Sequence, residues 1–201
     1  MASRVRRAFQ WLRRPHAAMA AGTLLSIGIV LGAAGLGGFG AFMGATNTEE
    51  FCISCHEMQA FPYAELQQSA HWTSASGVRP GCPDCHVPKA LVPKLVRKIQ
   101  ASLNEVPNHL LGKLDTPEKY EAHRLAMAQM VWDEMKASDS RECRSCHDVT
   151  AMALDEQRPR ARAQHEDAAK TGETCIDCHK GIAHTKPKLP DEPAAEEDFS
   201  L

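Results

Sequence analysis

Aromatic residues are scarce in this sequence of 201 residues, of which they make up 5%, and no segment shows the two-residue alternation typical of β-strands. The hydrophobic fraction of 43% is also slightly below the ~45–50% of ordinary soluble chains. These shortages predict a mainly α-helical protein with little regular structure. The formal net charge of −2 argues against a nucleic-acid-binding protein, which usually has a strongly basic surface.

Acidic residues are absent before Glu49, whereas five arginines occur between Arg4 and Arg14. The residues that follow these arginines are uncharged and mostly apolar over more than the ~20 positions that a helix needs to cross a membrane. A cleaved signal peptide, the alternative, would have a shorter apolar region of ~7–15 residues. We therefore expect an uncleaved, single transmembrane anchor over residues 17–45.

The arginines also predict the orientation of this anchor. Positive charge flanking one end of a membrane helix places that end in the cytoplasm, so residues 1–16 would be cytoplasmic. Residues 46–187 would then form a periplasmic domain on the inner membrane, followed by an acidic, disordered tail over residues 188–201. The glycines of the anchor could let another helix approach closely, which would permit a homo-oligomer, although glycine is also common in membrane helices.

No cysteine lies outside four CxxCH motifs, which span Cys52–His56, Cys82–His86, Cys143–His147 and Cys175–His179. This motif is typical of c-type haem attachment, in which two thiols form thioethers and the adjacent histidine lies under the iron. Zinc sites and disulfides are alternatives, but neither requires a histidine after every second cysteine. The motifs therefore predict four covalently bound haem c groups, attached through Cys52, Cys55, Cys82, Cys85, Cys143, Cys146, Cys175 and Cys178.

The motifs are arranged as an internal repeat. Their starts are separated by 30, 61 and 32 residues, which predicts two di-haem units, Cys52–His86 and Cys143–His179, joined by a longer connector. Four porphyrins would also supply apolar surface that a small, aromatic-poor domain lacks. We expect a multihaem cytochrome c domain built around these groups.

Further histidines are candidates for the second iron ligand. His71 lies 11 residues before the second motif and His165 lies 10 before the fourth, so the matched spacing favours both as distal ligands. His184, five residues beyond the last motif histidine, is favoured for the same role. The roles of His109 and His123 stay open, because His123 falls on the inner face of a predicted helix and could equally be a packed core residue.

Three segments have helical patterns. Thr116-Pro117-Glu118 is a typical helix start, and an apolar period of 3.6 residues follows it to about Ser138. Residues 157–170 predict a shorter polar helix. Residues 89–103 predict an amphipathic, cationic helix, which would lie in a membrane interface or pack on the haem core with its basic face in solvent.

These parts suggest an electron conduit that leaves the membrane. A lipid-soluble quinol, menaquinol or ubiquinol, is the expected donor, and a soluble periplasmic redox protein is the expected acceptor. Quinol oxidation releases two protons and two electrons. A base near the first haem, with a cation to hold the quinol oxygen, would therefore assist it.

The sequence resembles the NapC/NirT family of membrane-anchored tetrahaem cytochromes c, which is related to NrfH. The resemblance covers roughly residues 15–187 and rests on the anchor and on the segments CISCHEM, CPDCHVPK, GKLDTPEKYEAHR, MKASDSRECRSCH and TCIDCHKGIAH. Within the family, the sequence is most similar to the NapC subfamily of quinol dehydrogenases, which feed periplasmic nitrate reductase.

The resemblance implies a ligand set and a quinol site. Met58 would ligate the first haem in place of His56, leaving an open face towards quinol, and Lys98 and Glu105 would lie at the quinol site. The acid of the family is often aspartate, so Glu105 is a conservative departure. The other haems would be bis-histidine, with the ligands His86, His147, His179, His71, His165 and His184. Which distal histidine binds which haem stays open, with His184 favoured for the second haem. In an NrfH-type variation, the partner protein would supply one ligand and leave one of the three distal histidines free.

The implied function is that of a quinol dehydrogenase subunit with no terminal reductase activity of its own. It would deliver electrons to a periplasmic reductase or its cytochrome subunit, with nitrate reductase the first expectation and nitrite reductase, as in NirT-like proteins, the alternative. A non-catalytic haem scaffold or redox sensor is the alternative from a different class.

Overall fold

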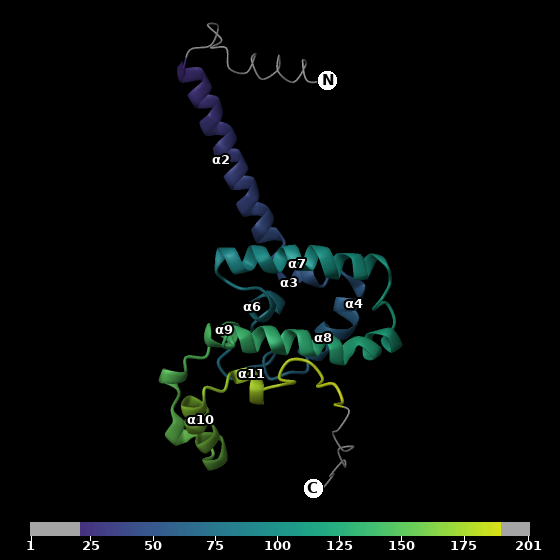
Figure 1. The fold of residues 1–201 in the computed structure, drawn as a ribbon, viewed down its shortest axis with the longest axis vertical. Coiled ribbons are helices and arrows are strands. Elements are labelled where there is room, and N and C mark those ends of the chain that lie inside the picture. Colours follow the sequence, from purple (N-terminus) through teal and green to yellow (C-terminus); the bar gives the residue numbers. More distant parts are fainter. Residues whose placement is uncertain (1–20, 190–201) are drawn as a thin grey trace, which may run out of the picture. The chain divides into compact units, whose positions relative to one another are not determined.

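The structure, a computed structural model, describes residues 21–189 (Figure 1). The predicted cytoplasmic segment 1–16, the first residues of the predicted anchor and the predicted acidic tail from residue 190 onward lie outside the described residues. The chain divides into two compact units, one ending at Thr46 and the other beginning at Asn47.

The first unit contains the predicted anchor. Helix α2 (Ala21–Ala45) has 25 residues and no charged side chain in its first or last turn. Its segment Gly22–Ala45 has a mean hydropathy of 1.9 and contains no buried residue. At about 1.5 Å per residue, this helix is longer than the ~30 Å hydrocarbon layer of a bilayer. Its length and composition therefore suit a membrane-spanning helix.

The second unit is helical throughout its described residues, which contain no strand. Its elements are α3 (Glu49–Cys52), α4 (His56–Met58), η1 (Gln59–Tyr63), α5 (Ala64–Leu66), α6 (Cys82–His86), α7 (Leu91–Leu110), α8 (Pro117–Ala137), α9 (Arg141–Arg144), η2 (Val149–Ala151), η3 (Leu154–Glu156), α10 (Pro159–Thr171) and α11 (Cys175–Cys178). Apart from α7, α8 and α10, these elements are single turns. The prediction of a mainly helical protein with little regular structure is confirmed.

Two long helices frame this unit. The side chain of Thr116 accepts a hydrogen bond from the backbone N–H of Lys119 at 3.3 Å, so α8 begins where its sequence predicts. The chain reverses between α7 and α8 at Gly112, whose φ of 59° suits glycine. A Cβ at this glycine would also lie 2.7 Å from Asp115 Oδ2, so that side chain would have to move. In Figure 1 the two helices run antiparallel, with α4 and α6 between them.

The second and fourth motifs share one local design. The backbone N–H of Gly81 donates to Asp84 Oδ2 at 2.9 Å, and the backbone N–H of Thr174 donates to Asp177 Oδ2 at 2.9 Å. In each case the carboxylate inside the CxDC sequence caps the turn that carries the two cysteines. The repeat seen in the sequence therefore extends to hydrogen bonding in these two motifs.

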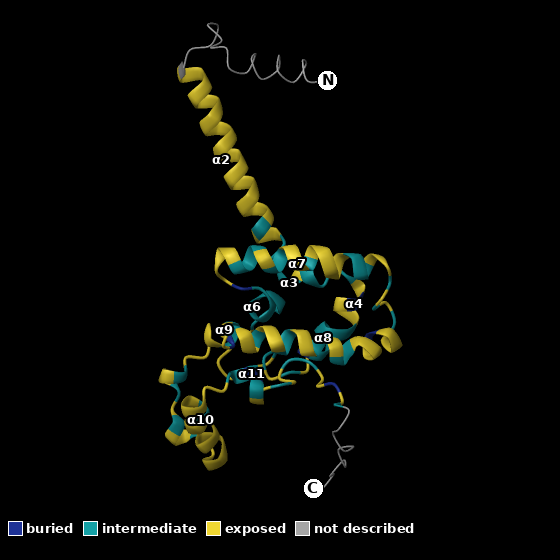
Figure 2. Ribbon diagram, viewed as in Figure 1, coloured by how far each residue is buried: buried dark blue, intermediate teal, exposed yellow. Residues whose placement is uncertain are grey.

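Side chains alone form only a small core, as Figure 2 shows. The described residues that are buried are Glu57, Leu66, Pro88, Tyr120, Ser140, Ile176 and Pro187. Of these, Tyr120 stacks on Phe61 with ring centroids 4.7 Å apart, which joins α8 to η1. The small number of buried apolar side chains thus agrees with the low aromatic content of the sequence.

Ser140 links the third and fourth motifs. It is fully buried and has a φ of 48°, in the left-handed region. Its Oγ accepts a hydrogen bond of 3.1 Å from the backbone N–H of Ile176, inside the fourth motif. One buried hydroxyl therefore fixes the start of α9 against α11.

We expect Ser140→Ala to lower the free energy of unfolding by about 1–3 kcal/mol, because the buried N–H of Ile176 loses its acceptor. Urea unfolding of the purified protein in detergent, followed by haem absorbance, measures this change. Ser138→Ala is the control, because its hydroxyl only donates to the nearby Met135 carbonyl, at 3.2 Å. Equal losses in the two variants would contradict the role of Ser140.

Candidate functional site

The four motifs are numbered here in chain order, with motif 1 at Cys52–His56, motif 2 at Cys82–His86, motif 3 at Cys143–His147 and motif 4 at Cys175–His179. None of the eight cysteines forms a disulfide; Cys146 and Cys178 are exposed and the others are half-buried. Their sulfurs are accessible to a covalently attached group.

Every motif histidine lies opposite a second histidine. The ring centroids are separated by 5.7 Å in His56–His109, 6.3 Å in His71–His147, 6.1 Å in His86–His184 and 6.0 Å in His165–His179. Two metal–imidazole bonds of about 2.0 Å on opposite sides of one ion place the ring centres about 6 Å apart. The residues present at each motif therefore fit an iron held between two imidazoles.

The distal candidates are distributed over three different motifs. His184 lies at motif 2, the position that the sequence favours, and His165 lies at motif 4, which it precedes. His71 precedes motif 2 in the sequence but faces His147 of motif 3. His71 and His165 have similar spacings to the motif that follows them, but only His165 faces that motif. Because His71 faces motif 3, the first predicted di-haem unit supplies a histidine to the second.

Burial favours the ligand form of the motif 2 histidines. It lowers the pKa of His86 to about 4, and it also lowers the pKa of His184 below its usual value. Both rings are therefore neutral near pH 7, and neutral imidazole is the form that binds a metal.

The space beside motif 2 is open. A cavity of about 390 Å³ lies between α7 and α8, with Val92, Val96 and Glu134 in its wall. It shares Arg97 and Glu134 with a smaller hollow that reaches Cys85 and His86. Because the hollow ends at the motif itself, we assign this space to the group that motif 2 holds.

The motifs follow one another in space in their chain order. Helix α3, which ends at Cys52 of motif 1, contacts α6, which carries Cys82 and Cys85 of motif 2. Helix α6 in turn contacts α9, which carries Cys143 of motif 3. The hydrogen bond from the backbone N–H of Ile176 to Ser140 joins motif 4 to the start of α9. The motifs form one continuous line.

The residues of the expected quinol site lie at the motif 1 end of this line. Lys98 and Glu105, both on α7, interact electrostatically with Cys52. Burial lowers the pKa of Lys98. Glu105 accepts a hydrogen bond of 2.5 Å from Arg97 Nη2. Arg97 was not a candidate in the sequence, because a spacing of eight residues from Glu105 carries no recognisable signal.

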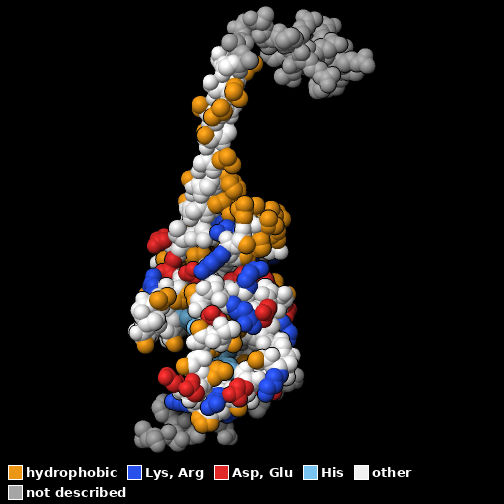
Figure 3. Space-filling view, turned by 90° about the vertical axis from the view of Figure 1, so that its left-hand side faces the viewer, with side chains coloured by type: hydrophobic (Ala, Val, Ile, Leu, Met, Phe, Trp, Pro, Cys, Tyr) orange, Lys and Arg blue, Asp and Glu red, His pale blue; other side chains and the backbone are white. Residues whose placement is uncertain are grey.

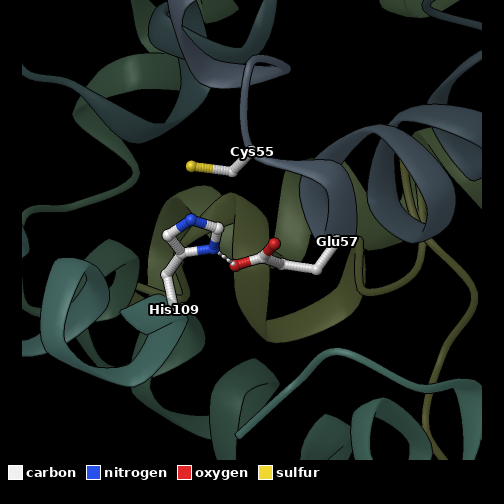
Figure 4. Close-up of side chains that lie close together, drawn as sticks. All are labelled: Cys55, Glu57 and His109. Carbon is white, nitrogen blue, oxygen red and sulfur yellow. Dashed lines mark hydrogen bonds and ion pairs between the residues drawn. The ribbon is translucent and has the colours of Figure 1, made fainter. Parts of the chain in front are cut away.

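Motif 1 has a second cluster that the sequence does not predict. Figure 4 shows Cys55, Glu57 and His109 close together, and their ligand-type atoms lie within 4.8 Å of one another. Glu57 is 5% exposed, and its Oε1 lies 2.5 Å from His109 Nδ1. Met58, which ends α4, is 39% exposed. Because Cys55 belongs to the haem motif, we assign the cluster to motif 1 and not to a separate metal ion.

His123 does not occupy the position that its sequence pattern predicts. The residue is exposed on α8, and its Nδ1 lies 2.8 Å from the Lys119 carbonyl oxygen. The prediction that it lies on the inner face of the helix is wrong, because the inward positions at this end of α8 are those of Tyr120 and Arg124.

Helix α7 presents an exposed apolar stripe. The stripe contains Leu91, Val92, Val96, Ile99, Leu103, Val106 and Leu110, each at least 50% exposed. Figure 3 shows hydrophobic side chains gathered on this unit beside lysine and arginine side chains. Two members of the stripe, Val92 and Val96, also line the cavity assigned to motif 2, so both arrangements expected for residues 89–103 remain predictions.

A network on α8 positions His184. Arg124 Nη2 donates to Glu65 Oε1 at 2.6 Å, and Arg124 Nη1 donates to the Thr185 carbonyl at 3.1 Å. Glu65 Oε2 in turn accepts from the backbone N–H of Thr185 at 3.1 Å. Burial opposes ionisation of Glu65, but the hydrogen bonds from Arg124 and Thr185 outweigh it and lower the pKa of the carboxyl. The segment after motif 4 is thereby fixed beside motif 2.

Each motif has a pair of cysteines followed by a histidine, and a second histidine faces the first. On a mainly helical scaffold, this arrangement defines a c-type cytochrome with covalently bound haem c. Residues 14–189 match the NapC/NirT cytochrome c family, N-terminal region. The chain belongs to this family of membrane-anchored electron-transfer cytochromes.

The chain is similar to several proteins from other sources. It is 50% identical to the cytochrome c-type protein NapC of Escherichia coli K12 over 195 residues, 97% of this chain and 95% of NapC. It is also 50% identical to the denitrification system component NirT of Stutzerimonas stutzeri over 88% of each chain. A chain in the crystal structure of the cytochrome c nitrite reductase NrfHA complex bound to the HQNO inhibitor is 23% identical, with a TM-score of 0.47, over 84% of this chain and 99% of that chain.

We expect Glu65→Gln to lower the free energy of unfolding by about 2 kcal/mol at pH 7, between the values for exposed and buried ion pairs. The pKa of Glu65 is lowered in the folded protein, so its contribution is present above its ordinary value of 4.5 and is lost as the pH falls through the folded value. Urea unfolding at several pH values should therefore show the difference from the wild type shrinking in acid.

Glu166→Gln is the matched control for this prediction. Glu166 pairs with Arg162 at 3.0 Å, but both side chains are about half exposed. The loss should stay under about 0.5 kcal/mol. A loss equal to that of Glu65→Gln, or a loss for Glu65→Gln that does not depend on pH, would contradict the assignment.

Proposed function

We propose that this protein oxidises quinol at the inner membrane and passes the electrons through four haem c groups to a periplasmic reductase. The observation that carries the proposal is that Lys98 and Glu105 lie on one helix, α7, and that their charges act on the pKa of Cys52 in motif 1, at one end of the series of motifs. An acid–base pair at the entry of an electron path is what quinol oxidation needs, because protons and electrons must leave together.

The number of haems follows from the four motifs. Each has two free cysteines and a pair of facing histidines, so each can hold one haem c. A relative from Allochromatium vinosum, 53% identical over 147 residues, carries the name putative tetraheme cytochrome-c type. We assign His71 to haem 3, His165 to haem 4 and His184 to haem 2.

At motif 1 we propose Met58 as an iron ligand, as the family resemblance implies. The residue lies two positions after the motif histidine, and a thioether ligand raises the potential of a haem. A higher potential at the first haem would favour electron uptake from quinol.

The quinol site would use three side chains of α7. Haem iron supplies one-electron redox chemistry at the motif. Lys98 is placed to donate a hydrogen bond to a quinol oxygen, and Glu105 is placed to accept a proton from the hydroxyl. Arg97 holds the Glu105 carboxylate by the 2.5 Å hydrogen bond and thereby orients it. Two electrons would enter the array for every two protons released.

The surface of α7 supports access from the membrane. Its exposed apolar stripe, beside Lys94 and Lys98, has the character of a helix that lies in a lipid interface. A lipid-soluble quinol could then reach motif 1 without crossing water. The arginines before the anchor support a cytoplasmic N-terminus and a periplasmic haem domain.

For the acceptor, we propose a periplasmic nitrate reductase or its cytochrome subunit. The similarity to NapC over 97% of the chain supports it. NirT is equally identical over 88% of the chain, and the cytochrome c-type protein TorC of Escherichia coli K12 is 43% identical over 92%. Delivery to a nitrite reductase is therefore the second candidate.

The entry site is tested by haem reduction in isolated membranes after addition of a quinol analogue. We expect Lys98→Ala with Glu105→Ala to slow this reduction about 100-fold, the usual size of a general acid–base contribution. Lys94→Ala, a lysine on the same helix, should stay within about twofold. If no reduction occurs in the wild type, or if the double variant reduces at the wild-type rate, the quinol site is wrong. Reoxidation by added nitrate reductase with nitrate, compared with nitrite reductase and nitrite, then identifies the acceptor.

The ligand assignments predict spin-state changes. His71→Ala, His165→Ala and His184→Ala, made singly, should each convert one low-spin haem to high-spin, because one iron loses an axial nitrogen. Electron paramagnetic resonance of the oxidised protein measures the conversion. A variant whose spectrum equals that of the wild type removes its residue from the ligand set. Met58→Ala should instead lower the potential of one haem, measured by redox titration, because the thioether ligand that raises the potential is lost.

A further inference from the structure

We propose that Arg97 couples the proposed quinol site to haem 2, because its side chain lines the space of haem 2 and also binds the carboxylate of Glu105. When Glu105 takes up a proton from quinol, its negative charge is lost, and the positive charge of Arg97 then acts on haem 2 without compensation. The potential of haem 2 rises, which favours transfer of the electron from haem 1. This coupling rests on the proposed function for the role of Glu105, but its electrostatic part can be measured without quinol.

Arg97 lies in the wall of the space assigned to haem 2. It lines the cavity of about 390 Å³ and the smaller hollow that reaches His86, and its side chain is 19% exposed. Burial, the neighbouring His184 and the positive charge of Arg97 all lower the pKa of His86, so this charge acts at motif 2. Reduction adds a negative charge to a haem, so a nearby cation favours the reduced form. Arg97 is therefore placed to raise the potential of haem 2.

The same side chain reaches the acid of the quinol site. Arg97 and Glu105 are eight positions apart on α7, about 12 Å along the helix axis, yet Arg97 Nη2 donates to Glu105 Oε1 at 2.5 Å. The Arg97 side chain therefore extends along the helix from the wall of the hollow towards Glu105. Glu105 is 61% exposed and is not among the described residues that line the cavity or the hollow. Arg97 thus joins the two places.

The other charges around this space do not change when Glu105 is protonated. Glu134, Arg141 and Glu142 also line the cavity or the hollow. Arg141 and Glu142 form an ion pair at 2.8 Å, so their charges compensate each other. Glu134 is exposed, where solvent screens its charge. The charge that responds to proton uptake is therefore that of the Arg97–Glu105 pair, which is neutral with the carboxylate and positive once the carboxyl is protonated.

This arrangement gives proton uptake an effect on electron flow. A proton passes from a quinol hydroxyl to Glu105, and an electron passes to haem 1. The uncompensated charge of Arg97 then draws this electron on to haem 2, which leaves haem 1 oxidised for the second electron. Because the Glu105 side chain is exposed, it can release its proton to water afterwards. Each quinol thus gives two electrons to the array and two protons to the solvent.

The test is a redox titration of the purified full-length protein in detergent, with small-molecule mediators and no quinol. Glu105→Gln imitates the protonated carboxyl, so it should raise the potential of haem 2, by about threefold in the ratio of reduced to oxidised haem. Arg97→Gln should lower this ratio about tenfold, which is about 59 mV for one electron. His184→Met identifies the potential of haem 2, because a methionine ligand raises it.

Lys94→Gln is the matched control, because Lys94 carries the same charge on α7 but lines neither the cavity nor the hollow. Its ratio should change by less than about twofold. The pyridine haemochrome assay should give four haems per chain for each variant. If Arg97→Gln does not mature, Glu105→Gln, a change at an exposed side chain, still decides the proposal.

An unchanged potential of haem 2 in Glu105→Gln, or a change in the same direction as that of Arg97→Gln, would overturn the coupling. A shift in Lys94→Gln as large as that in Arg97→Gln would overturn it as well, because any positive charge on α7 would then have the same effect. Failure of the proposed function looks different. If the potentials of Glu105→Gln and Arg97→Gln move in opposite directions but a quinol analogue does not reduce the wild type, the coupling stands and quinol is not the donor.

Discussion

The separation between facing imidazole rings is the constraint on which the rest of this structure depends. Each motif histidine has a second ring about 6 Å away, and these second rings come from distant parts of the chain. His184, for example, is 98 residues from the motif histidine that it faces, His86. At motifs 2, 3 and 4, where we propose that each pair encloses one iron, the connections between motifs have to fold so that these rings meet. The short turns and long helices of the unit serve this requirement.

The stabilising contacts lie where they hold such pairs in place. The Arg124–Glu65 ion pair fixes Thr185 next to His184, and Ser140 fixes motif 4 against motif 3. Glu57 has the same relation to His109. With few buried apolar side chains, these polar contacts carry a larger share of the specificity than in an ordinary hydrophobic core. The main stabilising contacts of this fold therefore position the histidine side chains that face the motifs.

Most of the site chemistry can be predicted from local sequence. The CxxCH motifs, the Thr116-Pro117 helix start and the uncharged anchor depend on neighbouring residues alone, and the helices appear where these signals place them. The pairing of His71 with motif 3 could not be predicted, because its spacing to motif 2 matches that of His165 to motif 4. A repeated spacing limits how far a histidine can lie from the next motif in the sequence, but it does not determine which motif the histidine faces after folding. The inner-face position predicted for His123 is wrong because a charged residue, Arg124, takes the inward position next to Tyr120, and an apolar pattern does not register a charged residue as buried.

The sequence by itself determined that haem c is bound through CxxCH motifs, that the protein is helical and that an apolar segment precedes the haem unit, because each property is carried by residues adjacent in the chain. The tertiary structure alone decided which histidine faces which motif, how Glu57 joins His109 at motif 1 and that Arg97 holds Glu105. These relations depend on the distances between side chains brought together by turns. Such distances arise only when the whole unit has folded.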